Sequence, residues 1–269
     1  ASGQSRFKTL AGISTPKLRE GWARAKDGLR FAVNFLASNA RIEDESLLSS
    51  PFFLPALSYA YERAGGRFDK DTERALLRWV LIGSARGYFS GSSETKLDAD
   101  LARLRRGEGP ASLLQNLEQQ FGRLHFDEGD IARRGERSGL YGLAYLALKG
   151  RGAKDWRTGL EVSLRHKGHQ HVIQSHHIFP KARIRETYDR AEVNEIANRA
   201  FISGDTNRRL YTSAPSEYLP EILEKRGNAA LVAQCVPLEP DLWRIERFPA
   251  FLEARRRALV AAVNELVAP

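Results

Sequence analysis

The first half of the chain carries apolar side chains at helical spacing. One stripe runs through Leu18, Trp22, Leu29 and Leu36. Recurrence at every third or fourth position predicts a helix with one buried face. The same spacing, interrupted by glycine and proline, predicts further helices at about 53–64, 71–87, 96–107, 111–122 and 137–149. Residues 1–150 are therefore expected to form one helical scaffold domain.

The pattern changes after a glycine-rich, basic stretch at 149–153, where a domain boundary is expected. Two short segments rich in β-branched or aromatic residues, 170–175 and 199–203, are predicted to be strands. Helical patterns occupy the segments 181–196, a stretch from Asp205 onward that is capped by Ser203, and 249–267. The sequence thus predicts a mainly α fold, in which a second domain at 151–269 embeds two strands in helices.

Composition and charge favour some partners and exclude some classes of protein. The chain has 42 Lys and Arg against 33 Asp and Glu, and this net charge of +9 favours a polyanionic partner. A single cysteine, Cys235, excludes an internal disulfide and suits a reducing cytoplasm. No run of 18 apolar residues predicts a membrane span, and no G-x-x-x-x-G-K-[ST] loop predicts nucleotide hydrolysis. Because the chain begins Ala1-Ser2-Gly3 and lacks methionine, we expect a piece of a longer protein.

Histidine is concentrated in one short segment. Of the six histidines, five lie between 166 and 177, namely His166, His169, His171, His176 and His177. A zinc cluster is one interpretation, but the segment has neither partner cysteines nor a helical H-E-x-x-H. The alternative is a catalytic site built on only part of the cluster.

The run Ser175-His176-His177-Ile178-Phe179-Pro180 is followed by Asn198 and, nine residues later, by Asn207. Hydrolysis of a phosphodiester needs a base that deprotonates water and a cation that offsets charge on the phosphate. Neighbouring residues of a strand point to opposite sides, so one histidine can face a metal while the other faces the attacking water. Two histidines that divide these roles would suit metal-dependent hydrolysis of a phosphodiester.

These residues resemble the HNH (ββα-metal) nuclease motif, in the version carried by GmrSD-type and SspE-like restriction enzymes, which follows a helical domain. The resemblance implies that His176 and Asn207 bind the metal, that His177 is the general base and that Asn198 braces the loop carrying the base. The interval from His177 to Asn198 is longer than in compact HNH motifs, so Asn194 is the alternative brace. Mg²⁺ is the expected ion, and imidazole ligation also suits Mn²⁺, Ni²⁺ or Zn²⁺.

The resemblance further implies a DNA endonuclease, the cleavage module of a modification-dependent or anti-phage restriction protein whose upstream nucleotide-dependent sensing domain is not in this sequence. An RNase with the same site and a DNA-binding module that no longer cleaves are the alternatives. A serine hydrolase built on Ser175 would lack the G-x-S-x-G elbow. No function is predicted for 215–248. Contacts with nucleic-acid phosphates are expected from the basic residues around the motif, which are Lys181, Arg183, Arg199, Arg208 and Arg209.

Overall fold

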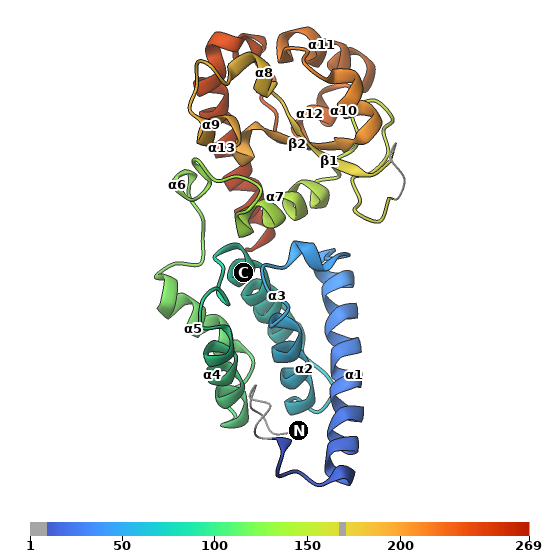
Figure 1. The fold of residues 1–269 in the computed structure, drawn as a ribbon, viewed down its shortest axis with the longest axis vertical. Coiled ribbons are helices and arrows are strands. Elements are labelled where there is room, and N and C mark those ends of the chain that lie inside the picture. The colour runs from blue at the N-terminus through green and yellow to red at the C-terminus, as the bar shows by residue number, and fades with distance from the viewer. Residues whose placement is uncertain (1–9, 167–170, 269) are drawn as a thin grey trace. The chain divides into compact units, whose positions relative to one another are not determined.

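The computed structural model describes residues 10–166 and 171–268, so His169 of the predicted cluster lies outside the described residues. The chain is mainly helical, as predicted, with a small sheet of two strands in its described part (Figure 1). It forms two compact units that divide between Leu124 and His125, and the last residues, from Val267, belong to the first unit. This division precedes the boundary expected near residue 150.

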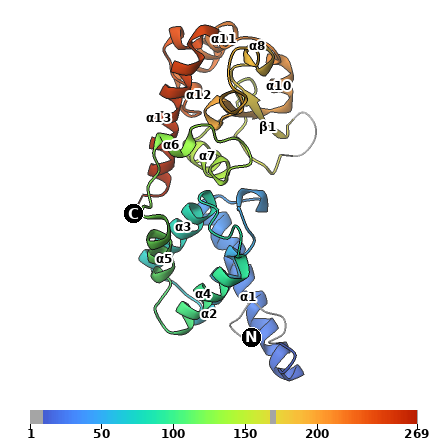
Figure 2. The ribbon, with the colours of Figure 1, turned by 60° about the vertical axis from the view of Figure 1, so that its left-hand side comes forward.

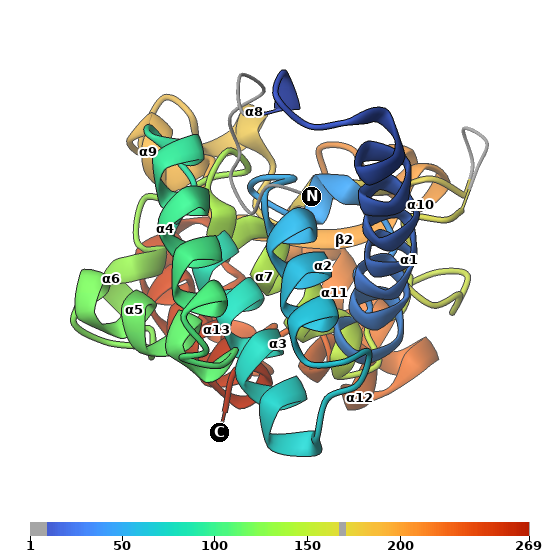
Figure 3. The same ribbon diagram turned by 90° about the horizontal axis from the view of Figure 1, so that it is seen from below.

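The first unit is a set of packed helices, each within a few residues of its predicted position. In chain order they are α1 (Thr15–Ala40), α2 (Phe53–Arg63), α3 (Lys70–Ala85), α4 (Ser93–Arg105) and α5 (Ala111–Phe121). Helix α1 lies alongside α2, and α3 packs against α5 (Figures 1 and 3). Aromatic rings fill the core, where Phe53 contacts Trp79 and Phe89 at centroid distances of 5.0 and 4.8 Å. Burial of these rings stabilises this unit.

The second unit combines short helices with the two strands. Its elements are α6 (Glu128–Ile131), α7 (Gly139–Gly150), β1 (Ile173–His177), α8 (Lys181–Ile184), α9 (Arg190–Val193), β2 (Arg199–Ser203), α10 (Gly204–Leu210), α11 (Pro215–Arg226), α12 (Asn228–Val232) and α13 (Phe248–Leu266). Helix α13 packs against α6 and α7 (Figure 2). The helix predicted at 137–149 therefore belongs to this unit, which explains the earlier boundary.

The two strands and the helix after them form a ββα unit. Strands β1 and β2 pair antiparallel, with His176 opposite Ala200 and His177 opposite Arg199. Helix α10 packs against both strands. Its first turn is capped by Ser203, as predicted, because the Ser203 hydroxyl accepts a hydrogen bond from the Thr206 amide at 3.3 Å.

The connection between the strands differs from its prediction. Instead of one helix over 181–196, it contains the two four-residue helices α8 and α9. Asp189 caps α9 through a 2.7 Å hydrogen bond from the Ala191 amide, so the chain starts a new helix at this point. No helix in the described parts of the chain has the length and apolar character needed to cross a membrane.

Candidate active site

Strand β1 places its two adjacent histidines in different surroundings. His176 is only 2% exposed and lies near Asn207 and Tyr218. His177 is half-buried and lies near Asn194 and Arg199. The alternation of side chains along a strand produces this separation, as the sequence predicted.

His176 and Asn207 form a direct contact, in which the histidine Nδ1 lies 2.7 Å from the amide Oδ1. The amide nitrogen of Asn207 donates to Gln174 Oε1 at 2.8 Å, and this bond turns the amide oxygen toward the imidazole. Because an amide oxygen can only accept, Nδ1 of His176 carries the hydrogen in this arrangement. The two predicted metal ligands are thus brought together.

Two aromatic residues enclose the other side of His176. The Tyr218 hydroxyl lies 3.4 Å from His176 Nε2 and donates to the Ile178 carbonyl at 3.0 Å. The Trp156 ring meets the imidazole edge-on, with centroids 6.1 Å apart. Burial lowers the pKa of His176 to about 4, so its imidazole is neutral at neutral pH and can bind a metal through a lone pair.

His177 is held by one acceptor and one donor. Its Nε2 lies 3.2 Å from Asn194 Oδ1, and its Nδ1 lies 3.3 Å from Nη1 of Arg199. Because a guanidinium only donates, Nδ1 carries the lone pair, and Nε2–H donates to Asn194. Burial and, secondly, the charge of Arg199 lower the pKa of His177 to about 4. The residue is therefore a neutral imidazole with a fixed tautomer.

Arg199 belongs to the surroundings of His177. Its side chain is 8% exposed and pairs with Glu136 at 3.0 Å. It also donates to Asn194 Oδ1 and Ser175 Oγ, at 3.3 and 3.4 Å. Sequence reasoning grouped Arg199 with the phosphate-binding residues around the motif, but the fold buries it beside the candidate base.

Asn198 braces the loop that follows His177. It is fully buried, its Oδ1 accepts from the Phe179 amide at 2.8 Å, and its Nδ2 donates to the carbonyls of Phe179 and Val193 at 3.1 and 2.9 Å. This geometry matches the brace role that the motif implied for Asn198. Asn194, the alternative, instead contacts the His177 ring directly.

A buried carboxylate fixes the start of α10. Asp155 accepts hydrogen bonds from the Ser203 amide at 2.7 Å and the Thr206 hydroxyl at 2.8 Å. Burial raises the pKa of Asp155, but these bonds and those from Thr158 outweigh burial and leave the pKa below its usual value. Through this anchor the loop at 155–158 holds the helix that carries Asn207.

The donor set of His176 and Asn207 fits a divalent cation. Adjacent ligands of an octahedral ion, each about 2.1 Å from the metal, lie about 3 Å apart. Nδ1 and Oδ1 lie 2.7 Å apart, close to this spacing, and Nδ1 would bind an ion once its hydrogen has moved to Nε2. Among the described residues no group of three or more His, Cys, Asp or Glu side chains is arranged to hold a metal. An ion at this pair would take its other ligands from water and substrate.

The other basic residues predicted to bind nucleic acid lie around the site with exposed side chains. Lys181 is exposed and lies close enough to His177 to lower the pKa of the imidazole. Arg183 pairs with Glu217 at 3.2 Å. Arg208 and Arg209 share one carboxylate, that of Asp205, at 4.0 and 3.1 Å.

Sequence reasoning missed three residues that contact the site. They lie on three different segments and are Glu136, Gln174 and Tyr218. Their contacts depend on long-range packing that no local pattern reveals. Asn194 was named from the sequence, but as the alternative brace and not as a partner of the His177 ring.

This geometry is the basis for assigning a function to the site. No family model matches the chain, and no curated protein is significantly similar to it.

Proposed function

We propose that the second unit is a metal-dependent DNA endonuclease of the HNH type. One observation carries the proposal: a ββα unit joins His176 to Asn207 and fixes the neighbouring His177 as a neutral imidazole. A metal-ligand pair and a base on adjacent residues are what hydrolysis of a phosphodiester requires.

In this proposal a water molecule displaces Arg199 from Nδ1 of His177, and Nδ1 then takes the proton of this attacking water. The Nε2–H of His177 donates to Asn194, which holds the ring and keeps the lone pair on Nδ1. As the water oxygen bonds to phosphorus, the bond from phosphorus to the leaving oxygen of the sugar breaks. Arg199 lies beside the same nitrogen and provides positive charge where the phosphate would approach.

His176 and Asn207 would hold the cation, with Gln174 orienting the amide. A divalent ion there supplies positive charge that offsets the negative charge developing on the phosphate. Mg²⁺ suits the amide oxygen, and the imidazole also suits Mn²⁺, Ni²⁺ or Zn²⁺.

The net charge of +9 and the exposed basic side chains around the site support DNA as the substrate. The resemblance of the His176 to Asn207 segment to restriction nucleases supports a role in modification-dependent or anti-phage restriction. An upstream nucleotide-dependent sensing domain and a cytoplasmic location belong to the same proposal.

The test is the conversion of supercoiled plasmid to open-circular or linear DNA in Mg²⁺, Mn²⁺ or EDTA. We expect cleavage with a divalent metal, none in EDTA, and loss by at least about 100-fold in His177→Ala. Asn207→Ala should weaken cleavage and raise the metal concentration needed. His171→Ala is the matched control, since this exposed histidine lies outside the site.

Cleavage that persists in EDTA or in His177→Ala would contradict the mechanism. A parallel reaction with single-stranded RNA separates the substrates. If RNA were cut while plasmid stayed intact, the enzyme would be an RNase using the same residues.

A further inference from the structure

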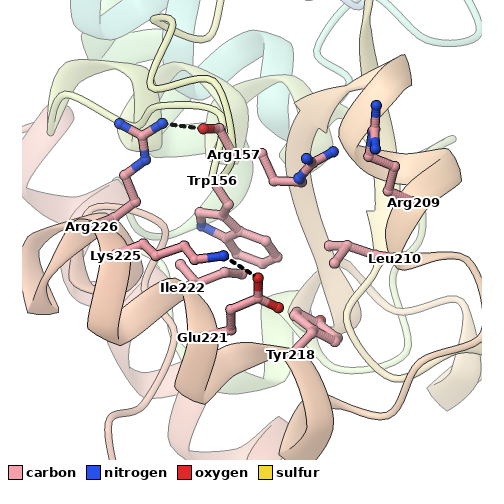
Figure 4. A pocket seen from close by; sticks show the side chains of 9 residues that line it. All are labelled: Trp156, Arg157, Arg209, Leu210, Tyr218, Glu221, Ile222, Lys225 and Arg226. Carbon is pink, nitrogen blue, oxygen red and sulfur yellow. Dashed lines mark hydrogen bonds and ion pairs between the residues drawn. The ribbon is translucent and has the colours of Figure 1, made fainter.

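A basic pocket of about 620 Å³ lies in the second unit, next to the candidate active site. It opens between the loop at 155–158, the end of α10 and helix α11 (Figure 4). The side chains that line it are Trp156, Arg157, Arg209, Leu210, Tyr218, Glu221, Ile222, Lys225 and Arg226.

Two of its walls are also walls of the His176 environment. The rings of Trp156 and Tyr218 lie 6.1 and 5.9 Å from the imidazole, measured between centroids. One layer of aromatic side chains therefore separates the pocket from the candidate metal ligand.

Positive charge exceeds negative charge around the pocket. Glu221 pairs with Lys225, and Asp205, just outside, pairs with both Arg157 and Arg209. Arg226 donates to the carbonyl oxygen of Arg157, as the dashed line in Figure 4 shows. The four cations that line the pocket thus face two carboxylates, which leaves an excess of two positive charges.

The lining favours a phosphate over a nucleobase. Trp156 is 1% exposed, so its ring face is not open for a base to stack on. The exposed groups are instead guanidinium and ammonium donors, which bind phosphate oxygens through charge-assisted hydrogen bonds.

We propose that this pocket holds a backbone phosphate of the same nucleic-acid strand, near the phosphate that is cleaved at His177. The inference rests on the proposed function and extends it, because it assigns residues 221–226, outside the motif, to substrate binding. A second anchored phosphate fixes the register of the strand relative to the base and the metal ligands.

The test is binding of a fluorescein-labelled 20-base-pair DNA, measured by anisotropy in EDTA at several salt concentrations. The double variant Lys225→Ala/Arg226→Ala should raise Kd about tenfold and reduce the slope of log Kd against log salt by about one. Arg257→Ala is the matched control, because Arg257 pairs with Glu253 four residues earlier in a helix, as Lys225 pairs with Glu221.

A variant that binds DNA more tightly than the wild type cannot be explained by misfolding. Glu221→Gln removes the carboxylate that pairs with Lys225, so it should lower Kd by about two- to fivefold. An unchanged Kd and salt slope in the double variant, equal to those of Arg257→Ala, would overturn the proposal.

The two proposals fail in different ways. If the chain were no nuclease, the wild type would not cleave plasmid, whereas the loss of binding in the pocket variants would still appear in EDTA.

A further experiment adds AMP and, separately, inorganic phosphate. If AMP bound the wild type tightly in calorimetry while the double variant bound DNA normally, the pocket would serve a free nucleotide and the proposal would be wrong.

Discussion

Asn198 holds both backbone polar groups of Phe179, two residues beyond the candidate base. Its Oδ1 accepts from the Phe179 amide, and its Nδ2 donates to the Phe179 carbonyl. The sequence interval between these residues contains α8 and α9, so one buried side chain closes a long excursion of the chain. The position of His177 therefore depends on a residue whose side chain bonds to the loop that follows it.

The first prediction follows from this contact. Asn198→Ala leaves the Phe179 amide and the carbonyls of Phe179 and Val193 buried without their partners. We expect the free energy of unfolding to fall by about 3 kcal/mol, because each orphaned buried group costs about 1–3 kcal/mol. Urea denaturation followed by circular dichroism measures this change. A loss below about 1 kcal/mol would show that the brace is dispensable.

Asn194 is expected to act on activity more than on stability. Asn194→Ala removes the acceptor that orients His177, while the metal-ligand pair stays intact. We expect kcat for plasmid cleavage to fall by about 10- to 100-fold, with little change in KM or in the metal requirement. Asn194→Asp, which keeps an acceptor, should recover part of the rate. Equal rates for wild type and Asn194→Ala would remove Asn194 from the site.

Arg255 supports the same region from α13. Its guanidinium is fully buried and donates to the carbonyls of Ile196, Ala197 and Gln234, and burial lowers its pKa to about 10. Arg255→Met removes the cost of burying a charge but orphans the carbonyls of Ala197 and Gln234, whereas the Ile196 carbonyl keeps the Arg199 amide. We expect the loss of these hydrogen bonds to outweigh the gain, so the free energy of unfolding should fall by about 2–4 kcal/mol. Thermal and urea unfolding measure it. Arg257→Ala on the exposed face of α13 is the control and should change stability by less than about 1 kcal/mol.

In the first unit, Asp100 makes stability depend on pH. Asp100 is fully buried, and burial raises its pKa from 3.8 to about 7, against the hydrogen bond from Tyr88. Between pH 3.8 and about pH 7, Asp100 therefore holds a proton in the folded protein but has released it in the unfolded chain. Stability should therefore fall as pH rises from 4 to 7, by up to about 1.4 kcal/mol per unit, and level off above 7.

Asp100→Asn tests this dependence, because the amide resembles the neutral carboxyl group. The variant should match the wild type near pH 4 and exceed it in melting temperature at pH 8. The other titrating groups are the same in both proteins, so their contribution cancels in the difference in stability measured across pH 4–9. Parallel curves would mean that Asp100 keeps an ordinary pKa.

Local patterns predicted much of this fold. Helical periodicity found α1 to α5, and the serine before Gly204 correctly predicted the cap of α10. Helix α11 was not predicted, because Pro220 inside it interrupts the helical pattern. The segment 215–248, for which the sequence predicted no function, supplies a wall of the basic pocket through α11.

Within the site, sequence patterns predicted contacts between nearby elements but not contacts with distant segments. The spacing of the motif correctly brought His176 and Asn207 together, since a strand, a capped helix and their packing are local features. The Arg199 contact with Glu136 depends on how a distant segment packs. Pattern alone grouped this arginine with the phosphate-binding residues because it is basic and lies beside the motif.

A substitution at Tyr211, the residue after α10, is predicted to raise the free energy of unfolding and not to lower it. Tyr211 is 77% exposed and has φ +33°, in the region that favours glycine, while its amide donates to the Asn207 carbonyl at 3.0 Å. Tyr211→Gly relieves this strain and keeps that hydrogen bond, so the free energy of unfolding should rise by about 1 kcal/mol. Arg208→Gly, in the middle of α10, should instead lower stability by about 1 kcal/mol. Urea denaturation of the two variants compares them directly, and a loss of stability in Tyr211→Gly would show that the tyrosine ring contributes more than the backbone costs.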